Sequence, residues 1–250
     1  MSMTALQIVQ QACLELGLPP PVALTATENE TSNQMLGLLN AAGYDLISNY
    51  QWEEMNRTYK FEIGADPLKD TYDLPVDYNY FLDCTGWDRT NRWPLLGPTT
   101  QQEWQALIAA KVQAVSRTYW IIQNKKISFW PYPLYPVTAD PVTPQGNRTI
   151  AISYSSLSWV ENGLQPGQYL NMIINDSDKP VLSDWLLVKF LKVKMWNAKG
   201  FDTAPLVTEF KVLFDSLSGK SKGSRVLSLA PKTGTVFIGV QNVPEGNWIR

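Results

Sequence analysis

Acidic side chains crowd one stretch of the sequence and are the residues best suited to chemistry. They are Glu53, Glu54, Asp66, Asp70, Asp73, Asp77, Asp83 and Asp88. Two carboxyl groups held roughly 5 to 9 Å apart can hydrolyse a glycosidic bond. Most acidic residues in such segments are solvated turn residues, and separation in space does not follow from separation along the chain. A carboxylate-dependent peptidoglycan hydrolase is therefore kept as an alternative.

Other reactive side chains are scarce. The sequence contains no histidine, which excludes Ser-His-Asp and Cys-His catalysis and histidine metal sites. Cys13 and Cys84 are the only cysteines, too few for a four-thiolate zinc site or a disulfide framework. We expect no catalytic, cofactor-binding or metal-binding residues, and a protein that is not an enzyme.

The net charge of the chain limits the kinds of partner that it can bind. The formal net charge is -2, from 21 Lys and Arg against 23 Asp and Glu, which lacks the positive field of an avid DNA-binding protein. Contact with DNA would be local, and the candidate DNA-facing or channel-lining residues are Lys189, Lys192, Lys194 and Lys199. Lysines on an amphipathic helix more often form an ordinary solvated face. No apolar run reaches the roughly 18 residues of a membrane span, and no signal peptide precedes residue 4, so we expect a soluble chain without a membrane partner.

Four amphipathic helices with end signals are predicted at the two ends of the chain. The first covers about residues 4–16, with Thr4 and Gln7 at capping-box spacing. The second runs from a capping box at Thr27 and Glu30 to about residue 50. The third begins at Asp178 and closes at Gly200, and the fourth runs from Thr203 to Gly219.

Between the two pairs of helices, apolar residues recur at every second position, which is typical of a half-buried strand. Tyr59, Phe61 and Ile63 alternate with charged residues, and two β-prone runs at 118–122 and 126–130 flank a turn. The predicted fold class is α+β, an antiparallel bundle of four main helices with an inserted sandwich or barrel-like β domain. The predicted boundaries are 1–55 and 166–219 for the helical core, 56–165 for the β-rich domain with one short helix, and 220–250 for an extended arm.

The arm carries apolar residues that need a partner surface. They are Val236, Phe237, Ile238, Val240, Trp248 and Ile249, which we predict to bind a neighbouring subunit or another protein. A strand folded back on the β domain is the alternative. Aromatic residues at 119–120 and 129–132 leave open a carbohydrate-binding tail module, although such residues usually fill a core.

Several phrases of the sequence, taken in order, resemble a phage family. They are Ala5-Leu6-Gln7-Ile8-Val9-Gln10-Gln11-Ala12, Leu16-Gly17-Leu18-Pro19-Pro20-Pro21, Tyr50-Gln51-Trp52 and Tyr72-Asp73-Leu74-Pro75-Val76-Asp77-Tyr78, followed by Trp-rich helices near residue 185. The order is similar to that of the head-to-tail adaptors (connectors, or tail tubular protein A) of short-tailed tailed bacteriophages, over most of residues 4–220. The segments 131–146 and 226–250 depart from it.

The resemblance implies a virion structural protein that acts without turnover. It implies a homo-oligomeric ring, dodecameric in the type members, located in the neck between capsid and tail. The ring would bind the portal protein on one side and a tail or nozzle protein on the other, and double-stranded DNA would pass through it during ejection. Before virus assembly the subunit would be in the host cytoplasm.

Overall fold

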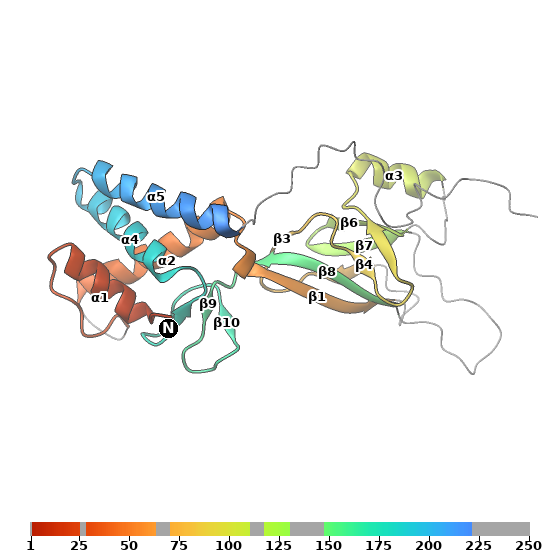
Figure 1. Ribbon diagram of the computed structural model, residues 1–250. Coiled ribbons are helices and arrows are strands. Elements are labelled where there is room, and N and C mark those ends of the chain that lie inside the picture. Colours follow the sequence, from red (N-terminus) through yellow and green to blue (C-terminus); the bar gives the residue numbers. More distant parts are fainter. Residues whose placement is uncertain (1, 26–28, 64–70, 111–117, 131–147, 222–250) are drawn as a thin grey trace, which may run out of the picture. The chain divides into compact units, whose positions relative to one another are not determined.

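The computed structural model describes residues 2–25, 29–63, 71–110, 118–130 and 148–221. Within them the chain forms two compact units, which are drawn in Figure 1. The helical unit comprises residues 2–56 and 155–221, and the sheet unit comprises residues 57–154. No helix in the described ranges is long and apolar enough to cross a bilayer.

One helix lies at the centre of the helical unit. α4 (Asp184–Lys199) packs against three other helices: α1 (Ala5–Glu15), α2 (Glu30–Asn49) and α5 (Ala204–Ser221). Leu186, Leu187, Val188 and Leu191 of α4 are completely buried, because neighbours cover it on several sides. Apolar residues therefore occur around α4 instead of along a single stripe.

The helical unit also contains strands. They form a small sheet in the order β10-β9-β11, from β9 (Val160–Glu161), β10 (Tyr169–Leu170) and β11 (Lys179–Pro180). Both outer strands are antiparallel to β9. Strands of two residues are too short to show an alternating pattern, so this sheet could not be predicted from the sequence.

The first predicted cap is confirmed and three other helix limits were wrong. At α1, the Thr4 hydroxyl accepts from the Gln7 amide at 3.3 Å, and the Gln7 side chain accepts from the Thr4 amide at 2.9 Å. At α2 the predicted cap Thr27 lies outside the described residues, and the N-cap is Asn29, whose side chain accepts from the Thr31 amide. α5 continues past Gly219 to Ser221.

Asp178 does not cap α4, which begins six residues later. The two residues after Asp178 pair with β9 as β11, and this pairing takes that part of the chain out of the helix. The Asp178 side chain is completely buried and accepts hydrogen bonds from the amides of Gly163, Ile174 and Asn175 at 3.0, 2.9 and 2.8 Å. It therefore fixes the loop between β10 and β11.

Trp159 is the largest completely buried side chain of the helical unit. Its indole N–H donates to the Asn171 carbonyl at 2.8 Å. Its ring lies against Gly43 of α2, where a Cβ atom would come within 2.2 to 2.5 Å of three ring atoms. The missing side chain of Gly43 is thus what lets the indole reach the helix backbone.

The sheet unit holds a curled mixed sheet of eight strands (Figure 1). The order along it is β1-β8-β4-β5-β6-β7-β2, with β3 paired to β8. The strands are β1 (Asn56–Ile63), β2 (Thr71–Asp73), β3 (Tyr78–Phe81), β4 (Trp87–Asp88), β5 (Trp93–Leu96), β6 (Thr118–Gln123), β7 (Lys126–Trp130) and β8 (Arg148–Ser156). β5 and β6 are parallel, joined through α3 (Gln101–Ala110).

Local predictions in the sheet unit are confirmed. β6 and β7 form the expected hairpin, and both turn residues, Asn124 and Lys125, have the positive φ angles of a tight hairpin turn. Thr100 and Glu103 exchange both bonds of a capping box at the start of α3, at 3.0 and 3.2 Å. Phe129 and Trp120 point into cores and are buried.

The predicted fold class, however, was wrong. The described residues contain five α-helices, a mixed eight-stranded sheet and a separate three-stranded sheet, which is α+β but not a four-helix bundle with an inserted domain. The prediction of a bundle assumed that the apolar faces of the four helices pack only against one another. In the structure three helices pack around α4 instead, and Val160 of β9 and Leu170 of β10 belong to the same core.

Candidate functional site

The acidic residues considered for hydrolysis are mostly engaged in structural contacts. Asp88 is buried and accepts from the amides of Thr90 and Asn91 at 2.9 and 3.0 Å. Asp73 lies 3.6 Å from the Lys126 amine. Asp83 is exposed, and Asp66 and Asp70 lie outside the described residues. The adjacent Glu53 and Glu54 line a small cavity, described below.

Asp77 belongs to a polar cluster in the sheet unit. It accepts from the Tyr154 hydroxyl at 2.9 Å and lies 3.8 Å from the Arg57 guanidinium. Burial, and then the hydrogen bond to Asp77, raise the pKa of Tyr154 far above its ordinary value. The phenol stays protonated and acts as a donor, so this cluster joins β8 to the turn before β3 and supplies no phenolate.

The four candidate DNA-facing lysines lie on α4, and three of them form ion pairs with neighbouring helices. Lys192 is 6% exposed and its amine lies 2.5 Å from Glu15 of α1 and 3.8 Å from Glu209 of α5. Lys194 pairs with Asp45 of α2, and Lys189 lies 3.5 Å from Glu209. Lys199 is exposed in the last turn. α4 is thus tied by charge to the same three helices that cover it.

We expect Glu15→Gln to cost about 2 kcal/mol of stability, and Lys192→Met to cost less than 1 kcal/mol. The first change leaves a buried ammonium with a more distant partner, whereas the second removes the charge and keeps the volume. Guanidinium chloride unfolding, followed by circular dichroism of the helices, measures both. Equal losses would contradict a buried position for the Lys192 amine.

The ion pair between Glu15 and Lys192 also makes the stability of the protein depend on pH. Burial raises the pKa of Glu15, but hydrogen bonds from Lys192 and Gln11 outweigh it, and the net pKa lies below the ordinary 4.5. A lowered folded-state pKa means that the unfolded chain binds more protons, so this stabilisation is present above pH 4.5 and lost as the pH falls through the folded-state pKa. The Glu15→Gln variant should lose less stability over this acidic range than the parent protein.

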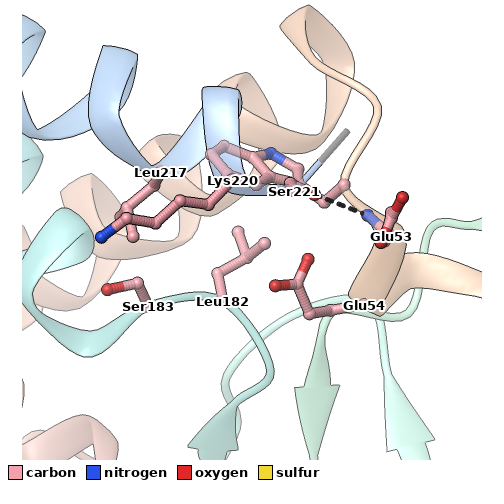
Figure 2. A pocket seen from close by; sticks show the side chains of 8 residues that line it. Glu53, Glu54, Leu182, Ser183, Leu217, Lys220 and Ser221 are labelled. Carbon is pink, nitrogen blue, oxygen red and sulfur yellow. Dashed lines mark hydrogen bonds between the residues drawn. The ribbon is translucent and has the colours of Figure 1, made fainter. Parts of the chain in front are cut away.

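A small pocket lies in the helical unit, next to the C-terminal end of α5 (Figure 2). Its volume is about 220 Å³, and it is lined by Trp52, Glu53, Glu54, Leu182, Ser183, Leu217, Lys220 and Ser221. Glu53 and Glu54 belong to a single 3-10 turn, η1 (Glu53–Met55). The Glu53 amide donates to the Ser221 hydroxyl at 3.1 Å, which fixes this turn to α5. This pocket could not be predicted from the sequence, because its walls come from three segments that are far apart in the chain.

α5 is the least covered helix of the helical unit. Ser221 is its only buried residue within the described range. Six of its apolar residues are half-buried, and these are Leu206, Val207, Phe210, Leu213, Phe214 and Leu217. The last four pack against the core of the helical unit. Val212 is 68% exposed on the outer side. An apolar helix with so little complete burial is typical of a surface that binds another protein.

The remaining predicted site residues cannot be placed. Val236, Phe237, Ile238, Val240, Trp248 and Ile249 lie outside the described residues, so their role as a partner-binding segment stays a prediction. Among the residues that are described, no three Cys, Asp or Glu side chains are grouped so as to hold a metal ion.

No protein-family model matches the chain, and no curated protein matches it.

Proposed function

We propose that this protein is a non-enzymatic assembly subunit that forms the head-to-tail adaptor ring of a short-tailed tailed phage. In this role it binds the portal protein and a tail protein and leaves a channel for DNA. The observation that supports it best is the incomplete burial of α5. A helix that keeps its apolar side chains half-buried gains stability when a neighbouring subunit covers it.

A ring subunit also needs a second surface, different from the first. In a closed ring each copy binds the next head to tail, so two unlike faces of one subunit must meet. α1 and α5 pack on different sides of α4 (Figure 1). Both carry exposed large apolar side chains, Leu14 on α1 and Val212 on α5. These two faces are the candidates for the head-to-tail contact.

The alternatives have less support in the described residues. Trp120 and Phe129, two of the rings that the sequence offered for stacking on sugars, are 3% and 0% exposed and belong to a core. Among the described acidic residues outside the pocket, Asp88 holds a turn, Asp73 forms an ion pair and Asp77 accepts from Tyr154. An assembly role needs neither an open stacking platform nor a carboxyl pair.

Size-exclusion chromatography with light scattering tests the proposal, using the protein alone and mixed with its phage's portal protein. We expect a ring, or a stable complex with the portal. Val212→Glu should weaken the assembly at least tenfold, because it places a charge on a face that becomes buried. Val76→Glu, at a fully exposed position of the sheet unit, is the matched control. A monomer that ignores the portal would contradict the proposal.

A further inference from the structure

The pocket beside α5 has an apolar floor and charged ends. Trp52 and Leu182 are both 4% exposed, and Leu217 is half-buried above them. Figure 2 shows Glu53 and Glu54 at one end, and the Lys220 amine near Ser183 at the other. A site of about 220 Å³ is smaller than the 300–1,000 Å³ typical of small-molecule pockets, and suits one or two protein side chains.

These charges define the kind of peptide that would fit. A bulky apolar side chain would cover the floor, a basic side chain beside it would meet Glu53 and Glu54, and an acidic side chain a few residues away would meet Lys220. Ser183 adds a hydroxyl that caps no helix amide through its side chain, so it is available to a ligand. The pocket is thus prepared for an apolar and basic dipeptide preceded by an acid.

One segment of this chain has that composition. We infer that the pocket binds residues 245–250 of the same chain, Glu245-Gly246-Asn247-Trp248-Ile249-Arg250. Trp248 and Ile249 would cover the floor, Arg250 would pair with Glu54, and Glu245 would pair with Lys220. An extended segment of this length spans about 17 Å, so its two charges can reach opposite ends of one pocket.

Two further observations favour this occupant. Two other apolar runs lie beyond Ser221. Val236 to Val240 has no charged residue within it or directly beside it, and Val226 to Ala230 has Arg225 beside it but no acidic residue to meet Lys220, so neither matches both ends of the pocket. The chain also continues from Ser221, which itself lines the pocket. A tethered segment has an effective concentration in the millimolar range, so weak contacts suffice for binding within one chain.

Disulfide trapping in the full chain tests this inference. The variant carries Glu53→Cys and Ile249→Cys, with the exposed Cys84 changed to Ser. The control carries Val22→Cys in place of Glu53→Cys, at a site 92% exposed on the helical unit and outside the pocket. We expect the pocket pair to form an intrachain disulfide at least tenfold faster than the control. Adding Arg250→Glu should slow it, and adding Glu54→Lys as well should restore it.

The outcomes of the trapping experiment distinguish binding within one chain from binding between two copies and from no binding. Equal rates for the pocket pair and the control, or no effect of charge reversal, would overturn the inference. A disulfide found only between two copies, by non-reducing gels and peptide mass spectrometry at low protein concentration, would also overturn it, because the occupant would then be a second copy. The inference does not depend on the adaptor function, which light scattering of the parent protein tests separately.

Discussion

Gly43→Ala is expected to destabilise the helical unit by about 3 kcal/mol, which lowers its melting temperature by roughly 10 °C. The new methyl group would lie 2.2 to 2.5 Å from the ring of Trp159, far inside normal contact distance. The ring cannot move easily, because it is completely buried and its N–H is bonded to Asn171. Thermal unfolding followed by circular dichroism measures the loss.

The same helix provides the control. Gly37 also lies within α2, but a Cβ there meets nothing within 4 Å. Gly37→Ala should therefore stabilise the protein by about 0.5–1 kcal/mol, through helix propensity alone. Combining Gly43→Ala with Trp159→Leu should cost less than the sum of the two single changes. If both glycine variants were stabilising, Trp159 would not lie on the helix as described.

Asp178→Ala is expected to cost about 4 kcal/mol. Three backbone N–H groups would lose their acceptor in a completely buried site, and each unsatisfied donor costs about 1–3 kcal/mol. Asp178→Asn should cost about half as much, because its amide oxygen keeps part of the bonding while its NH₂ group faces another donor. Guanidinium chloride unfolding of both variants gives the two values.

Asp176 is a matched control for Asp178. Its side chain accepts three hydrogen bonds as well, from the amides of Leu24 and Thr25 and from the Thr25 hydroxyl, at 3.1, 2.9 and 3.0 Å. It is only half-buried, so water can replace the lost acceptor, and Asp176→Ala should cost about 1–2 kcal/mol. A loss as large as that of Asp178→Ala would mean that burial is not what makes Asp178 important.

Local structure could be predicted from this sequence wherever a short-range physical rule decides it. Thr4 and Thr100 cap helices as predicted, because a capping box is complete within four residues. The turn at Asn124 and Lys125 follows from two β-prone runs separated by a short polar link. Gly200 ends α4 in the left-handed conformation that glycine favours.

Features set by distant contacts could not be predicted. Asp178 is a good N-cap by residue type, yet pairing of the next two residues with β9 gave it another role. The sequence predicts that Lys192 belongs to a solvated helix face, but its amine forms an ion pair with Glu15, which is far away along the chain. The pocket had no local signal at all, since η1, the segment before α4 and the end of α5 meet only in the folded unit.

The central place of α4 has a consequence for synthesis on the ribosome. α1 and α2 emerge first, but their shared partner follows only after the whole sheet unit has been made. At about 5–20 residues per second, the delay between the end of α2 and the end of α4 is roughly ten to thirty seconds. During that time the apolar faces of both helices lack their main contact, and the nascent chain is a natural client for chaperones. The core of the helical unit therefore contains helices that are translated before the sheet unit, yet it is completed only after that unit has been made.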